Sequence, residues 1–196
     1  MKSIVMAYLP GNHGGDALAD ILFGDVNPSG KLPFSYPMYA NSLVNYNHKP
    51  SENQEKMAGA YDYEGAVNLL YPFGQGLSYT TFEYSGLTLN RELLGRDDEL
   101  EFSVVVKNTG SKAGKEVVQI YFSDVFASLT PDVKRLCAFE KVQLAPGESK
   151  ELSFQLPLKA FSFVNYNSQR ITEAGEFVLM VGGLKQSFVV EHDVAF

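Results

Sequence analysis

Three aspartates near the start of the chain, Asp16, Asp20 and Asp25, are close enough in sequence to suggest an acid/base pair or a metal site. A working carboxylate pair needs two unlike environments that separate the two pKa values. The neighbouring residues favour simpler roles: Asp16 follows two glycines and is expected to cap a helix, Asp20 would face solvent, and Asp25 would lie in a turn. No group of His, Cys or carboxylate residues has metal-ligand spacing. We therefore expect neither a metal nor another cofactor.

A further candidate is His13, which lies in the run Gly11-Asn12-His13-Gly14-Gly15 directly after an apolar segment. Open α/β sheets bind ligands at the carboxyl ends of their strands, and a helix N-terminus attracts anions. The run lacks the G-x-G-x-x-G spacing and the βαβ unit of a dinucleotide site, so a nucleotide is not expected. His13 stays a candidate for substrate contact in a larger enzyme, against the simpler interpretation of a loop histidine.

The run Tyr61-Asp62-Tyr63 contains the groups that hold sugars. Aromatic faces pack on a sugar ring, and a carboxylate accepts hydrogen bonds from its hydroxyls. We keep Tyr61, Asp62 and Tyr63 as substrate-binding candidates in an outer subsite of an intact enzyme. The competing interpretation is that these rings cover a junction between domains.

The composition excludes several classes of protein. The chain has 196 residues, with 16 Lys+Arg and 23 Asp+Glu, and a net charge of −7, whereas general nucleic-acid binding requires clustered positive charge. No apolar run approaches the roughly 18–20 residues that span a bilayer, so neither nucleic acid nor membrane is an expected partner. The single cysteine, Cys137, cannot form an internal disulfide and is expected to be a buried thiol. The apolar stretch near Met1 is too short for a signal peptide, which leaves the localisation of the chain open.

The pattern in residues 1–37 predicts a βα unit. Ser3–Leu9 is an apolar run typical of a buried parallel strand, the next segment has one apolar helical face, and Gly24 stands where a helix ends in a left-handed residue. One βα unit is not a domain, because a parallel sheet needs further strands and cover on both faces. We therefore expect these residues to expose apolar surface, with self-association through the strand edge as one consequence.

Residues 38–79 are rich in aromatic side chains and show little periodicity, which predicts a long linker. Loops of this length are usually functional or disordered, and the aromatic residues favour packing onto a surface. Gly74 and Gly76 would allow close backbone turns. The expected junction core consists of Tyr71, Phe73, Tyr79 and Phe82.

From residue 80 onward, short apolar–polar alternations are separated by turn signals. Residues 100–106 alternate with one buried face, Val117–Phe122 is expected to be a central strand, and Pro146-Gly147 fits a type II turn. Gly182-Gly183 splits a closing hairpin. About seven short strands indicate an antiparallel β-sandwich of immunoglobulin-like type, without the Cys–Trp–Cys core of antibody domains because the chain has no Trp.

Three groups of motifs together resemble the carboxyl-terminal part of glycoside hydrolase family 3, the β-glucosidase and β-xylosidase family. They are the run 14–33, the run 71–82, and a third set made of residues 107–110, 114–119 and 144–149. Their order and spacing also match, over essentially the whole chain.

This resemblance implies three parts: residues 1–37 as the C-terminal remnant of an α/β-sandwich domain, 38–79 as an aromatic-rich linker, and 80–196 as a fibronectin type III-like domain. The expected fold class is thus mainly β, an immunoglobulin/fibronectin type III-like antiparallel β-sandwich preceded by a truncated α/β-sandwich remnant.

The resemblance also implies what the chain lacks. The nucleophilic aspartate of the family lies on an N-terminal (β/α)₈ barrel, and its acid/base glutamate lies earlier in the α/β-sandwich domain. Retaining glycosidases need both carboxylates, so no catalytic residue is assigned here. The expected role is a structural or accessory one in a bacterial enzyme of the periplasm or the exterior. Its partners would be the barrel, the rest of the α/β-sandwich domain, and an oligo- or aryl β-glycoside substrate.

Two other functions compete with this expectation. An independent carbohydrate-binding or adhesion module is favoured by the tyrosines, whereas the absence of Trp, the usual flat platform for sugars, stands against it. A small self-sufficient hydrolase has no nucleophile elbow or triad in the sequence to support it.

Overall fold

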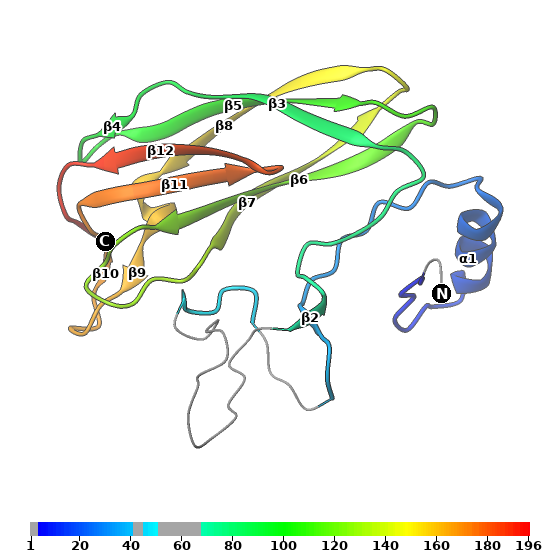
Figure 1. The fold of residues 1–196 in the computed structure, drawn as a ribbon, viewed down its shortest axis with the longest axis horizontal. Coiled ribbons are helices and arrows are strands. Elements are labelled where there is room, and N and C mark those ends of the chain that lie inside the picture. The colour runs from blue at the N-terminus through cyan, green and yellow to red at the C-terminus, as the bar shows by residue number, and fades with distance from the viewer. Residues whose placement is uncertain (1–3, 41–44, 51–67) are drawn as a thin grey trace, which may run out of the picture.

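In the computed structural model, which describes residues 4–40, 45–50 and 68–196, most of the chain after residue 81 forms two β-sheets packed face to face (Figure 1). The smaller sheet has the order β3-β5-β8 and the larger one β4-β12-β11-β6-β7. Neighbouring strands are antiparallel, except that the short edge strand β4 runs parallel to β12. The mainly β, fibronectin type III-like fold class is confirmed.

The strands of the sandwich are β3 (Phe82–Leu89), β4 (Leu93–Leu94), β5 (Glu99–Asn108), β6 (Gly114–Asp124), β7 (Arg135–Leu144), β8 (Ser149–Pro157), β11 (Gly175–Val181) and β12 (Leu184–Val190). A 3-10 helix, η2 (Leu158–Phe161), leads to a small sheet of β9 (Phe163–Val164), β10 (Arg170–Thr172) and β13 (Val194–Ala195). Before the sandwich come α1 (Gly14–Phe23), β1 (Tyr36–Pro37) and β2 (Leu69–Tyr71).

The sandwich core follows from alternation along the strands. In β5 every second side chain points inward, and these inward residues are at most 4% exposed: Leu100, Phe102, Val104 and Val106. The predicted central strand is part of β6, which lies between β11 and β7. The end of the core is aromatic: the ring of Phe161 packs against Phe122, Phe177 and Phe188 at centroid distances of 5.1–6.0 Å.

Two turns have the geometry that their residues predict. Glu148 N donates to Ala145 O at 3.0 Å, with Gly147 at φ +76°, as a type II turn requires. The hairpin between β11 and β12 turns at Gly182 and Gly183, both with positive φ. A Cβ on Gly182 would lie 2.2 Å from Cγ of Tyr84, so this position needs glycine for space as well as for conformation.

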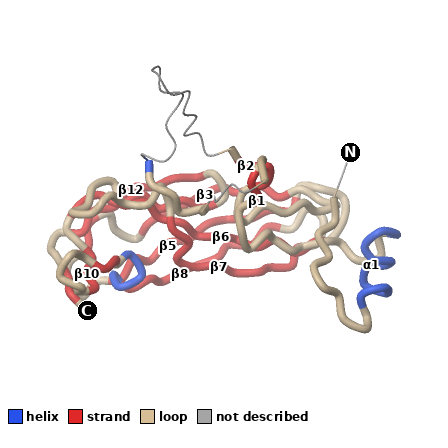
Figure 2. Tube along the Cα trace, turned by 90° about the horizontal axis from the view of Figure 1, so that it is seen from below, coloured by secondary structure: helices blue, strands red, loops and turns tan. Residues whose placement is uncertain are grey.

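Helix α1 lies at the end of the molecule opposite β10 (Figure 2). Gly24 ends it in the left-handed conformation, as predicted, and its N–H donates to Asp20 O and Ile21 O. The expected cap at Asp16 is wrong: the helix already begins at Gly14, so His13 is the N-cap residue and makes no side-chain cap bond. The two glycines adopt helical backbone conformation, which places Asp16 inside the first turn.

The strand expected at Ser3–Leu9 is wrong as well, since residues 4–9 contain no strand within the described part of the chain. A parallel strand requires a neighbouring strand to take its hydrogen bonds, and an apolar run by itself supplies none. The expected exposure of apolar surface is confirmed: Ile4 is 58% exposed, Leu9 97% and Phe23 85%.

The C-terminal end of the linker pairs with the end of the part that precedes the linker. Tyr36 of β1 pairs with Tyr71 of β2, and Leu32 exchanges backbone hydrogen bonds with Gln75 O and Gly74 N, each at 2.8 Å. Since Gly76 comes so close to Gly30 that a Cβ would lie 2.1 Å from Gly30 O, the predicted need for glycine here is confirmed. Residues 30–38 and 68–76 thus run side by side.

We predict that Phe161→Ala lowers the free energy of unfolding by about 3–5 kcal/mol, because it leaves a cavity among three buried rings. Chemical denaturation followed by circular dichroism measures the loss. The matched control is Phe126→Ala, at a side chain that is 84% exposed, where a change within about 0.5 kcal/mol is expected. Equal losses in the two variants would contradict this assignment of the core.

Candidate functional site

The structure describes only part of the site predicted from the sequence. Tyr61, Asp62 and Tyr63 lie outside the described residues. His13 lies at the start of α1, with Nδ1 4.0 Å from Asp16 Oδ2 and both side chains about nine-tenths exposed. Asp20 and Asp25 are exposed too. No acid/base pair is therefore assembled from these carboxylates.

Two further features are absent from the part of the chain that the structure describes. Among residues 4–40, 45–50 and 68–196, no three His, Cys, Asp or Glu side chains are placed to hold a metal ion. No helix within the same ranges is long and apolar enough to cross a membrane.

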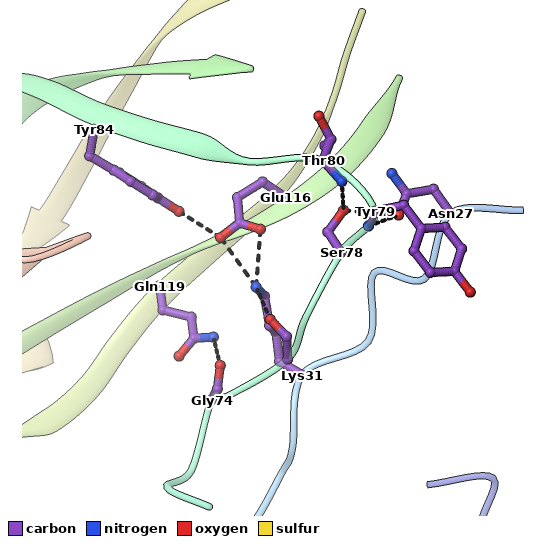
Figure 3. Close-up of polar contacts among 10 residues, drawn as sticks. Asn27, Lys31, Gly74, Ser78, Tyr79, Thr80, Tyr84, Glu116 and Gln119 are labelled. Atoms are coloured by element: carbon purple, nitrogen blue, oxygen red, sulfur yellow. Dashed lines mark hydrogen bonds and ion pairs between the residues drawn. The ribbon is translucent and has the colours of Figure 1, made fainter. Parts of the chain in front are cut away.

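A cluster of polar side chains lies where the segments before the sandwich meet β3 and β6 (Figure 3). We call it the joint. Its members are Asn27, Lys31, Gly74, Ser78, Tyr79, Thr80, Tyr84, Glu116 and Gln119.

The centre of the joint is Glu116, which is only 8% exposed although it is a carboxylate. It occupies an inward-facing position near the start of β6. Lys31 Nζ binds both of its oxygens, at 3.0 and 3.3 Å, and the hydroxyl of Tyr84 donates to it from the opposite sheet at 2.9 Å. Two causes raise the pKa of Tyr84 well above its usual range: burial is the larger, and the negative charge of Glu116 is the smaller. This phenol therefore stays protonated and acts as a hydrogen-bond donor.

Three further side chains, those of Asn27, Tyr79 and Gln119, extend the joint on either side of Glu116. Asn27 Oδ1 accepts hydrogen bonds from Ser78 Oγ at 2.9 Å and from Tyr79 N at 2.8 Å, and its Nδ2 donates to Ala113 O at 3.0 Å. Tyr79 reaches α1 through its hydroxyl, which donates to Ile21 O at 2.6 Å. On the other side, Gln119 Nε2 donates to Gly74 O at 3.0 Å. The joint therefore ties three separate parts of the sequence together.

The side chain of Asn108 connects backbone and side-chain groups at the start of the sandwich, next to the joint. It is fully buried, and its side chain makes four hydrogen bonds. Oδ1 accepts from Thr80 Oγ1 at 2.6 Å and from Gly110 N at 3.1 Å, while Nδ2 donates to Lys112 O at 2.8 Å and Leu144 O at 3.1 Å. Because a buried amide with unmet hydrogen bonds is costly, Asn108 fixes its own turn, residues 108–112, relative to Thr80 and Leu144.

The alternation of residues in the sequence already indicates that Glu116 faces inward, although a carboxylate is usually exposed. Gly114, Glu116, Val118 and Ile120 alternate along β6, which places Glu116 on the inner face with the apolar residues. The partner Lys31 carries no such signal, because it lies 85 residues upstream. Of the predicted junction core, Tyr71, Phe73 and Phe82 are partly buried, whereas Tyr79 is 44% exposed.

Two family models match the chain. A model of the glycosyl hydrolase family 3 C-terminal domain matches residues 1–79, and a model of the fibronectin type III-like domain matches residues 116–185. The joint lies across these two matches, with Lys31 in the first and Glu116 in the second.

Similar proteins are much longer than this chain. It is 42% identical over 187 residues to a periplasmic β-glucosidase of Salmonella typhimurium, covering 92% of this chain and 24% of the relative. It is 38% identical over 183 residues to a β-xylosidase of Formosa agariphila, covering 93% and 25%. A crystal structure of a β-glucosidase from Listeria innocua in complex with gluconolactone gives a TM-score of 0.83 at 37% identity, over 94% of this chain and 27% of that one. The chain thus spans about a quarter of the length of these relatives.

We predict that Glu116→Ala lowers the free energy of unfolding by about 3 kcal/mol, because it leaves Lys31 buried without its counter-ion. Urea denaturation measures the loss. The control is Arg91→Ala, which breaks the more exposed Arg91–Asp98 ion pair and should cost less than about 1 kcal/mol. Similar losses in both variants would contradict a special role for the joint.

We also predict that Cys137 resists thiol reagents in the folded chain. Burial raises its pKa to about 12, and its Sγ donates to Ile120 O at 3.4 Å, so little of the reactive thiolate forms at mildly alkaline pH. A chromogenic disulfide reagent should react slowly with the native chain and rapidly in denaturant. A native rate equal to the denatured rate would show that the thiol is accessible; Cys137→Ser supplies the blank.

Proposed function

The chain belongs to glycosyl hydrolase family 3, and on this premise we propose that it serves a β-glucosidase-type enzyme as a non-catalytic structural part. The observation that carries the proposal is the extent of the matches: the chain corresponds to the family's C-terminal and fibronectin type III-like domains and spans about a quarter of its relatives. The two catalytic carboxylates, which the family resemblance locates upstream of these domains, would come from other parts of the enzyme.

The proposed division of the chain is residues 1–37 as the end of the α/β-sandwich domain, 38–79 as the linker and 80–196 as the fibronectin type III-like domain. The joint supports this role, since Lys31 and Asn27 fix the first part to the sandwich. A rigid connection of this kind would let the sandwich brace the α/β-sandwich domain.

The exposed apolar residues of the first part support the same proposal. Leu9, Leu22 and Phe23 are 97%, 68% and 85% exposed, and their burial against the rest of the α/β-sandwich domain would be favourable by the hydrophobic effect. The proposed partner is that domain together with the (β/α)₈ barrel. Self-association through this surface is the outcome we propose when the partner is absent.

For the whole enzyme we propose hydrolysis of oligo- or aryl β-glycosides. His13, Tyr61, Asp62 and Tyr63 remain our proposed substrate contacts in that enzyme. A periplasmic β-glucosidase is among the relatives, which supports a location in the periplasm or outside the cell for the bacterial parent enzyme.

We predict that the purified chain releases no product from aryl β-glucosides above the buffer blank, because the catalytic pair would be missing. A chromogenic assay at high protein concentration measures this. Hydrolysis that disappears when carboxylates of this chain, such as Asp16 and Asp124, are changed to amides would overturn the proposal.

A chimera tests the structural role. In it, this chain replaces the matched quarter of the Salmonella relative. The chimera should hydrolyse β-glucosides faster than the relative from which that quarter has been removed. The double variant Leu9→Asp with Phe23→Asp should lower activity about tenfold, since it places two charges in the proposed interface. The control is Phe139→Asp, a 67% exposed aromatic residue on β7. Equal activity of the double variant and the parent chimera would reject the interface.

A further inference from the structure

A small pocket lies at the far end of the sandwich from α1, below the aromatic end of the core. It has a volume of about 160 Å³ and is bounded by Lys49, the β6–β7 connection and β9. The segment 45–50, cyan in Figure 1, closes one side, because Val133 N donates to His48 O at 2.9 Å and Asn47 Nδ2 lies 3.4 Å from Asp132 Oδ2.

The charges that line the pocket are balanced. Lys49 Nζ pairs with Asp132 Oδ1 at 2.5 Å. Arg135 Nη1 donates to Ser162 O at 2.9 Å, and the Arg135 guanidinium lies 5.2 Å from the centre of the Phe122 ring. With Asp124 as the fourth charged group, the lining has two acids and two bases. Glu173 lies outside the lining and is held by hydrogen bonds from Ser128 N and Oγ.

Asp124 has unused hydrogen-bonding capacity. Its Oδ1 accepts one bond, from Phe126 N at 3.2 Å, and among the described residues no ion pair joins its carboxylate to a cation. An ionised carboxylate can accept roughly four hydrogen bonds. Burial raises the pKa of Asp124 to about 6, so at neutral pH the group is mostly ionised and can accept bonds from a ligand.

We propose that this pocket binds one neutral monosaccharide, a single pyranose. Its volume is below the roughly 300–1,000 Å³ of drug-sized sites and suits one sugar ring. Asp124 would accept hydrogen bonds from sugar hydroxyls and Arg135 would donate to them. The ring of Phe163, which lines the pocket and is only partly buried, supplies apolar surface for the C–H face of the sugar. A free anion would meet two carboxylates, and an organic cation would meet Lys49 and Arg135.

Only the choice of glucose as the probe rests on the proposed function. The test is a titration of the ¹⁵N-labelled full chain with glucose, followed by amide chemical shifts. Saturable shifts confined to residues 122–135 and 161–164, with a millimolar Kd, are expected. Glucosamine and glucuronate, which carry one charge each, should bind several-fold more weakly. Binding of either charged sugar as tight as that of glucose would overturn the assignment to a neutral ligand.

Two variants probe the pocket itself. Asp124→Asn should raise the Kd for glucose about tenfold, the loss expected for a hydrogen bond to a charged group. Ala127→Leu should fill the pocket from the β6–β7 connection and abolish the shifts, which keeps the test decisive if the first variant unfolds. The control is Glu101→Gln, a carboxylate in the open groove on the outer face of β5, and it should leave the Kd unchanged.

Absence of saturable shifts, or shifts centred on Glu101, would overturn the pocket assignment. Either result would leave the proposed structural role intact, since that role is judged by catalysis and by the chimera. Conversely, hydrolysis by the isolated chain would overturn the proposed function without bearing on the titration.

Discussion

A charge that is buried between two sheets needs hydrogen-bond partners and a counter-charge within reach. The way in which Glu116 meets this requirement fixes the position of the segment before the sandwich. Its carboxylate points inward from β6, where an unpaired ion would cost several kcal/mol. Tyr84 supplies one hydrogen bond from the opposite sheet, and Lys31 supplies the counter-charge from 85 residues upstream. The same ion pair that satisfies the sandwich therefore holds the preceding segment in place, and Asn27, Gln119 and Asn108 reinforce that position.

The motifs that carry the family resemblance make structural contacts in this chain. No catalytic role is assigned to them. Lys31, Gly74 and Gly76 come from the first two groups of motifs, while Asn108, Glu116 and Gln119 come from the third. They meet across the joint or beside it. In this chain, the motifs that resemble the family therefore connect the segments before the sandwich to the sandwich itself.

The β-sandwich could be predicted from the sequence because alternation, turn glycines and strand length are local properties. Gly147, Gly182 and Gly183 adopt the conformations that their turns require. The strand at Ser3–Leu9 could not be settled locally, because an apolar run does not specify the neighbour that completes its hydrogen bonds. The predicted cap at Asp16 was wrong because Gly14 and Gly15 already belong to the helix. In the candidate site, the inward position of Glu116 was available from alternation, whereas Lys31 and the pocket at Asp124 depend on long-range packing. Tyr61, Asp62 and Tyr63 stay a prediction.

The pairing of residues 30–38 with 68–76 affects how the chain would tolerate a change of length between the two segments. Met38 N donates to Asn68 O at 3.1 Å, so the two ends of the intervening stretch are held next to each other. The entropy of closing a loop between fixed ends grows only slowly with its length. A change of chain length between residues 38 and 68 would therefore cost little in closure entropy, and Glu116 with its partners Lys31 and Tyr84 lies outside this interval.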